Sequence, residues 1–211
     1  MIISEKESDR GTLKRVPVSV NNTIQYGGYM KYIFASDIHG SAYYCKKLLD
    51  VFEHSGAEQL ILMGDLLYHG ARNDLPEEYG TKDCTAMLNE YFNRIIACRG
   101  NCDSEIDQMV LQFPIMSDYN ILKLNGITFF QTHGHIYNPE KLPPLGVCQA
   151  LVFGHIHLPV ARKQDDIYIL NPGSTSIPKG GNPGSYAILD DNIWTIKDFE
   201  GNVLKEIEIA V

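Results

Sequence analysis

The stretch KYIFASDIHG, residues 31–40, joins an apolar run to a polar loop that ends in glycine. The apolar run predicts a buried strand, and Asp37 and His39 follow it directly. Side chains in this position lie at the edge of a sheet, where ligands usually bind. The same arrangement recurs along the chain, and we expect strands at residues 31–35, 59–63, 95–98, 127–131 and 150–153.

Each expected strand leads to side chains that bind metal ions well: Asp37 and His39, Asp65, Asn101, His133, and finally His155 and His157. Single pairs such as Asp37-x-His39 also occur in ordinary turns and helix caps. A His-x-His pair straight after an apolar run is harder to explain by packing, which favours metal binding at residues 155–157. Carboxylate, imidazole and amide ligands without a thiolate pair suit two adjacent Mn, Fe, Co or Zn ions rather than a structural zinc.

Length and composition limit the kind of protein this is. With 211 residues, of which 44% are hydrophobic, the chain can form one sizeable core. Its formal net charge of −8 argues against a nucleic-acid polymer as partner, because phosphate-backbone binding depends on Lys and Arg. Five cysteines without a Cys-x-x-Cys pair favour a reducing, cytoplasmic location. No apolar run approaches the roughly 18 residues that span a bilayer, so we expect no membrane partner.

Residues 1–29 differ in character from the rest of the chain. Residues 4–15 are charged and polar, and residues 16–29 show no helical period. We therefore expect a disordered N-terminal extension, followed by one domain over residues 30–211. A second hypothesis is a mis-called start, with translation beginning at Met30, because Gly27-Gly28 can arise from a purine-rich ribosome-binding site read in frame.

The order of the expected elements indicates the fold class. Apolar residues spaced i, i+3, i+4 and i+7 predict a helix between the N-cap Ser41 and the terminal Gly56, and a second helix over residues 84–91. A third helix is expected after a cap at Asp103 or Ser104. Turn pairs later in the chain predict hairpins, at residues 125–126, 165–166, 191–192 and 201–202. Crossovers followed by hairpins are most simply housed in an α/β fold of two packed mixed β-sheets flanked by helices.

The ordered motifs resemble those of the calcineurin-like metallophosphoesterases. The series is Asp37-x-His39, Gly64-Asp65, Gly100-Asn101, His133-Gly134 and Gly154-His155-x-His157. From residue 30 onward the chain also looks like the bacterial YfcE-type phosphodiesterases, through residues 35–41, 99–105, 132–135, 171–174 and 176–183. The resemblance implies an α/β/β/α sandwich with two divalent metal ions. Manganese is the metal it implies first, with iron, cobalt, nickel or zinc as alternatives.

The resemblance further implies a role for each ligand. One ion would be held by Asp37, His39 and His157, the other by Asn101, His133 and His155, with Asp65 bridging the two. Such a dinuclear centre implies a phosphodiesterase that hydrolyses a small phosphodiester by in-line attack of a metal-bridging hydroxide. The alternatives are a phosphomonoesterase acting on nucleotides or phosphoproteins, and a non-catalytic scaffold of the same fold, as in the retromer-subunit relatives.

Other residues are candidates for contact with a small phosphate-ester substrate. Many family members carry His directly after the metal-binding Asn, where this chain has Cys102. A neutral thiol is a poorer partner for a phosphoryl oxygen than an imidazolium, so we expect Cys102 either to restrict catalysis or simply to fill space. His135, and His69 and Arg72 at the pocket mouth, are expected near the substrate, although each can also be an ordinary surface residue. A homo-oligomer is a further expectation that the sequence leaves open.

Overall fold

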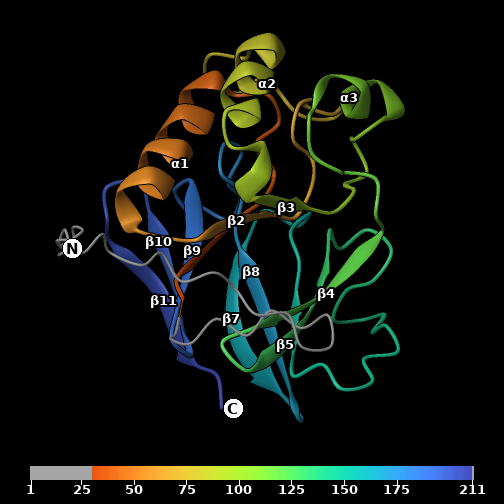
Figure 1. Cartoon of the computed structure of the whole chain (residues 1–211), viewed down its shortest axis with the longest axis vertical. Coiled ribbons are helices and arrows are strands. Elements are labelled where there is room, and N and C mark those ends of the chain that lie inside the picture. The colour runs from red at the N-terminus through yellow and green to blue at the C-terminus, as the bar shows by residue number, and fades with distance from the viewer. Residues whose placement is uncertain (1–29, 211) are drawn as a thin grey trace, which may run out of the picture.

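The fold consists of two β-sheets packed face to face (Figure 1). The computed structural model describes residues 30–210, so the expected N-terminal extension lies outside the described residues. One sheet has six strands in the order β11-β10-β9-β1-β2-β3, namely β11 (Val203–Glu208), β10 (Ile193–Asp198), β9 (Ser185–Asp190), β1 (Tyr32–Ala35), β2 (Gln59–Leu62) and β3 (Ile95–Ala97). The other has five strands in the order β4-β5-β6-β8-β7, namely β4 (Tyr119–Leu124), β5 (Ile127–Thr132), β6 (Ala150–Val152), β8 (Ile167–Pro172) and β7 (Pro159–Gln164).

Helical crossovers connect the parallel strands β1, β2 and β3. Helix α1 (Ala42–Ser55) begins at the expected N-cap, where Ser41 Oγ accepts a hydrogen bond from the Tyr44 N–H at 3.2 Å. It ends at Gly56, whose φ of 71° is the left-handed conformation that glycine adopts without strain. Helix α2 (Thr81–Asn89) begins and ends earlier than the predicted residues 84–91, and Tyr91 lies beyond its end, before a 3₁₀ turn, η1 (Phe92–Arg94).

The four predicted turn pairs all join antiparallel neighbours, and the predicted hairpins are confirmed. They connect β4 to β5, β7 to β8, β9 to β10 and β10 to β11. Asn125, Asp165 and Asp191 have positive φ in these turns, which matches the twist of the flanking strands. Both sheets contain parallel and antiparallel pairs, so the prediction of two packed mixed sheets is also confirmed.

The hydrophobic core has three layers. Phe34, Phe129 and Trp194 are fully buried between the two sheets. On the outer face of the six-stranded sheet, α1 and α2 contribute buried side chains such as Leu48 and Leu88. The outer face of the five-stranded sheet is covered instead by loop side chains from residues 137–148. The helices α1 and α2 therefore cover only one of the two sheets (Figure 1).

Among residues 30–210, no helix is both long enough and apolar enough to cross a bilayer.

The aromatic cluster between the sheets yields a stability prediction. Phe34 contacts Trp194 at a ring-centroid distance of 4.6 Å and Phe129 at 5.9 Å. We expect Phe34→Ala to lower the free energy of unfolding by about 3–5 kcal/mol, because it leaves a cavity between the sheets. Urea denaturation followed by the fluorescence of Trp194, the only tryptophan of the chain, measures this. Phe92→Ala is the matched control, since Phe92 is 47% exposed and its loss should change stability by no more than about 0.5 kcal/mol.

Candidate metal centre

Five loops that follow strands meet at one edge of the two sheets. Those after β1, β2 and β3 belong to the six-stranded sheet, and those after β5 and β6 belong to the five-stranded sheet. The Asp37 N–H donates to the Gly64 carbonyl at 3.1 Å, and the Gly154 N–H donates to the His133 carbonyl at 2.8 Å. A further bond crosses between the sheets, from the His155 N–H to the Asp37 carboxylate at 2.9 Å. The loops therefore form one hydrogen-bonded unit.

Glycine allows these loops to approach one another closely. A Cβ atom added at Gly100 would lie 2.1 Å from Asp65 Oδ1. One added at Gly154 would lie 1.8 Å from Ser36 Oγ, in the loop of the opposite sheet. Any side chain at either position would force the loops apart. The glycines beside the expected ligands thus set the spacing of the centre.

Most of the expected ligands have an unusual backbone conformation. Positive φ values of 49–66° occur at five of them, Asp37, His39, Asp65, His155 and His157. The other non-glycine residues with positive φ among residues 30–210 are three in hairpin turns and Glu78. Left-handed backbone costs an L-residue roughly 1–2 kcal/mol and persists where surrounding contacts impose it. Such clustering is typical of a functional site.

Three imidazoles are held in a defined orientation by backbone carbonyls. The Nδ1 atom of His39 lies 2.8 Å from the carbonyl oxygen of Tyr68. The Nδ1 atom of His133 lies 2.5 Å from the carbonyl oxygen of Met63. The Nδ1 atom of His157 lies 2.6 Å from the carbonyl oxygen of Ile177. A hydrogen bond at Nδ1 fixes the tautomer in which Nε2 carries a free lone pair. The three Nε2 atoms face inward, toward the two carboxylates. This is the arrangement expected of imidazoles that bind metal ions.

The carboxylates of Asp37 and Asp65 lie between these imidazoles. Asp37 Oδ1 is 3.2 Å from His157 Nε2 and 3.6 Å from His39 Nε2. It is buried and has no hydrogen-bond donor. Asp65 Oδ2 lies 3.7 Å from His39 Nε2 and 3.4 Å from His133 Nε2, between the two expected ligand sets. A buried carboxylate oxygen without a hydrogen-bond donor, beside imidazole nitrogens that can act as ligands, fits a cation, because a cation satisfies both kinds of atom.

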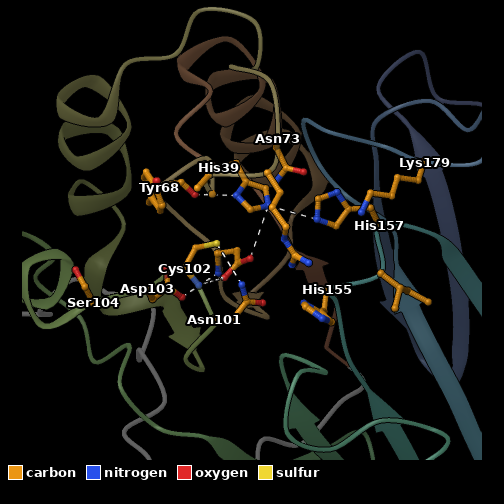
Figure 2. A pocket seen from close by; sticks show the side chains of 15 residues that line it. His39, Tyr68, Asn73, Asn101, Cys102, Asp103, Ser104, His155, His157 and Lys179 are labelled. Carbon is orange, nitrogen blue, oxygen red and sulfur yellow. Dashed lines mark hydrogen bonds and ion pairs between the residues drawn. The ribbon is translucent and has the colours of Figure 1, made fainter.

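Asn101 and His155 lie at the exposed side of this group (Figure 2). Asn101 Oδ1 is 3.1 Å from His133 Nε2, although the residue as a whole is exposed. The ring of half-buried His155 is 5.1 Å from that of His133. The structure therefore brings all seven expected ligands together, five of them buried and two at the rim.

Charge in the ion-free centre is balanced between carboxylates and imidazoles. Burial would raise the pKa of Asp37, but His157 and His39 outweigh this effect and hold the pKa well below its usual range. Burial would lower the pKa of His133, yet the carboxylates of Asp65 and Asp37 raise it to about 9. Without an ion, a proton on His133 therefore supplies part of the positive charge that the carboxylates require.

Asp103 holds the centre together in a way that the sequence did not reveal. Its carboxylate accepts hydrogen bonds from the N–H groups of Asp65, Leu66 and Gly100, at 2.7–2.9 Å. The helix cap is instead Ser104, whose side chain forms a capping box with Asp107 at the start of α3 (Glu105–Val110). Asp103 thus fixes the loop of Asp65 against the loop of Asn101. An Asp just before a helix is usually interpreted as the N-cap, so the sequence alone did not indicate that Asp103 joins these two loops.

A cavity of about 900 Å³ opens over the centre. Cys102 and Lys179 line it together with His39, His155 and His157 (Figure 2). Arg72 is a further lining residue. Burial and the nearby carboxylate of Asp65 raise the pKa of Cys102 to about 12, so this side chain is a neutral thiol.

Two other expected substrate contacts lie elsewhere. His135 lines a neighbouring cavity of about 350 Å³, which shares His155 and Ile156 with the larger one. His69 does not line the larger cavity, because its ring packs between Tyr68 and Tyr79. Lys179 lies in the segment 176–183 that carries part of the resemblance, and the structure also places it on the wall of the larger cavity.

Comparison with known proteins agrees with this geometry. The model of the calcineurin-like phosphoesterase superfamily domain matches residues 30–192. Phosphodiesterase YfcE of Escherichia coli K12 is 50% identical over 167 residues, which cover 79% of this chain and 91% of that relative. A solved structure of YfcE, described as a phosphoesterase from E. coli, has a TM-score of 0.83 at 46% identity and covers 86% of this chain and 100% of its own.

A more distant structure shares the fold alone. Vacuolar protein sorting 29 from Cryptosporidium parvum has a TM-score of 0.61 at 16% identity, over 85% of this chain and 98% of its own. The family model and the identity to the E. coli relative confirm the resemblance of the motifs: this chain belongs to the calcineurin-like phosphoesterase superfamily.

Proposed function

We propose that this chain hydrolyses a small phosphodiester by in-line attack of water, with two divalent metal ions as cofactors. The observation that carries the proposal is the buried pair Asp37 and Asp65, surrounded by three imidazoles of fixed tautomer. The name phosphodiesterase, carried by the relative that is 50% identical, supports the choice of reaction.

Two ligand sets share the centre in this proposal. Asp37, His39 and His157 would hold one ion, and Asn101, His133 and His155 would hold the other. Asp65 would serve both, since its Oδ2 atom lies 3.7 Å from His39 Nε2 and 3.4 Å from His133 Nε2. When bound, the ions supply a water molecule of lowered pKa and a positive field for the phosphoryl oxygens. Manganese is the proposed metal, by resemblance, because the donor set itself also suits iron, cobalt, nickel or zinc.

The chain's own residues position the substrate. Arg72 on the cavity wall can donate to an anionic group of the substrate, and His135 can contact the substrate from the neighbouring cavity. Cys102 lies at the cavity wall, and a neutral thiol is a weak hydrogen-bond donor. It offers little help to a poor leaving group, which supports diesters with good leaving groups as substrates. The free cysteines among the described residues agree with the cytoplasmic location that we propose.

Phosphomonoester hydrolysis is the alternative with the same fold and metals. A monoester carries one more negative charge than a diester and usually relies on a strong donor near its leaving oxygen, which Cys102 does not supply. A non-catalytic scaffold has less support, because it has no need for seven converging ligand side chains.

The proposed function predicts a defined pattern of activity. Chelated protein should regain hydrolysis of bis-(p-nitrophenyl) phosphate with added Mn²⁺, and should turn over p-nitrophenyl phosphate more slowly. His157→Gln should lower this activity by more than about 100-fold. Removing a residue that only bonds to a metal ligand typically costs about 10- to 100-fold, and His157 is proposed as a ligand itself. His54→Gln is the matched control, because His54 lies on the exposed surface of α1 and bonds only the Asp50 carbonyl. Absence of activity with every metal tested would refute the proposal.

The position of Cys102 predicts a gain of activity. Cys102→His should raise hydrolysis of esters with poor leaving groups by about tenfold or more, because an imidazole near the phosphate is a better hydrogen-bond and proton donor than a thiol. Rates across a panel of phosphomonoesters and phosphodiesters, with metal content measured in parallel, check this. Equal or lower rates across the panel at unchanged metal content would show that Cys102 has no chemical role.

The raised pKa of His133 predicts that metal binding displaces protons. Its pKa of about 9 in the folded, ion-free chain lies above the value of about 6.5 expected on unfolding. Protonation of His133 therefore stabilises the ion-free fold below about pH 6.5, and this contribution is lost as the pH rises through about 9. At pH 7.5 a metal ion must displace that proton, so affinity for Mn²⁺ should increase with pH up to about 9.

Calorimetric titration of chelated protein with Mn²⁺, in two buffers of different ionisation enthalpy, measures the protons released. At pH 7.5 the apparent heats should differ between the buffers, and the difference should shrink above about pH 9. Identical heats in both buffers at pH 7.5 would contradict the expected displacement.

A further inference from the structure

Two cationic side chains, Arg72 and Lys179, lie on the wall of the cavity above the metal centre. Both residues are exposed, and within residues 30–210 neither side chain has an ion pair or a hydrogen bond. The acidic residues on the same wall are Asp65 and Asp103, both buried and both already bonded to backbone N–H groups. The accessible charge on this wall is therefore entirely positive, in a chain whose formal net charge is −8.

The loops that carry these cations are attached to two of the proposed ligands. The loop of Arg72 begins at Tyr68, whose carbonyl lies 2.8 Å from His39 Nδ1. The Lys179 N–H donates to the His157 carbonyl at 3.1 Å, and Figure 2 shows its side chain beside His157. His39 and His157 are neighbours, with Nε2 atoms 3.3 Å apart. The loops of both cations are thus attached to the side of the centre formed by His39 and His157.

Internal bonds hold both loops in shape. In the first, the Asn73 side chain donates to the His69 carbonyl at 2.8 Å, and its N–H donates to Gly70 at 3.1 Å. In the second, the Asn182 side chain donates to the Lys179 carbonyl at 2.8 Å. Arg72 and Lys179 are therefore carried by turns with internal hydrogen bonds at the cavity.

A simple phosphodiester leaves part of the positive charge around this cavity unmatched. Two divalent ions carry four positive charges, which would be balanced by at most three negative charges on Asp37, Asp65 and Asp103 and one on the attacking hydroxide. A simple diester adds one negative charge, whereas Arg72 and Lys179 add two positive charges. One positive charge is left over and would attract a second anionic group.

We infer that the natural substrate is a phosphodiester that bears a further anionic group, such as a phosphate, on one of its alcohols, and that Lys179 and Arg72 bind this group. The inference rests on the proposed function and narrows its substrate class. This further anionic group would lie on the side of His39 and His157, between the loops that carry Arg72 and Lys179.

A pair of esters that differ only in one phosphate tests this. The probes are thymidine 5′-(p-nitrophenyl phosphate) and the same ester bearing a 3′-phosphate, which share the leaving group and the nucleoside. The wild-type chain loaded with Mn²⁺ should prefer the 3′-phosphorylated ester in kcat/KM, mainly through a lower KM. The preference should shrink as salt is added, because the contact involves exposed charges.

Three variants assign the preference to residues. Lys179→Gln and Arg72→Gln should each reduce the ratio of the two kcat/KM values by about three- to tenfold. Lys179→Arg should retain most of it. Lys205→Gln is the matched control, because it removes the same charge from an exposed position on β11 and should leave the ratio unchanged.

A binding measurement provides a readout that does not depend on turnover. Chelated, inactive protein should bind thymidine 3′,5′-bisphosphate more tightly than thymidine 5′-phosphate in calorimetric titration, and Lys179→Gln should abolish the difference. If either glutamine variant fails to fold, the wild-type preference and its loss in salt still decide the question.

The two ideas can fail separately. If bis-(p-nitrophenyl) phosphate is hydrolysed but the wild-type chain shows no preference for the phosphorylated ester, the inference is wrong and the proposed function stands. An equal loss of preference in Lys205→Gln would also overturn the inference. If no ester is hydrolysed with any metal, the proposed function fails, and equal affinity for the two nucleotides would then overturn the inference as well.

Discussion

The metal centre depends on three hydrogen bonds between imidazole Nδ1 atoms and backbone carbonyls. The acceptors belong to Met63 and Tyr68, which follow β2, and to Ile177, which follows β8 in the other sheet. Each bond decides which nitrogen of its imidazole faces the carboxylates, because Nδ1 is already occupied. The fold therefore has to hold these three carbonyls in place, because otherwise the imidazoles would not present Nε2 to the carboxylates. The sheet order, the glycine contacts and the bonds to Asp103 all act on these same loops.

Much of this arrangement could be predicted because its signals are local. Ser41 and Gly56 mark the ends of α1 through contacts within one turn of helix. The hairpins follow from turn residues that adopt positive φ next to their own strands. The expected ligands could be found because each lies in a glycine-containing loop after an apolar strand, and in a layered sheet this position leads to a common edge.

The remainder could not be predicted, because it depends on residues far apart in the chain. Asp103 accepts hydrogen bonds from N–H groups 37 and 38 positions away, and nothing near it distinguishes that role from a helix cap. His135 follows His133 by two residues, yet it lines a different cavity, since the chain turns at Gly134. Likewise, loop side chains rather than a helix cover the outer face of the five-stranded sheet, and such packing has no sequence period.

The distribution of the ligands between the two sheets has a mechanical consequence. Asp37, His39 and Asp65 extend from the six-stranded sheet, whereas His133, His155 and His157 extend from the five-stranded one. An ion held by Asp37, His39 and His157 would bond to both layers at once, and an ion held by Asp65 and His133 would do the same. Binding to the native state alone stabilises that state by mass action. The cofactors would then act as cross-links between the sheets, and loss of metal would loosen the sandwich at the edge where it is otherwise held by loops.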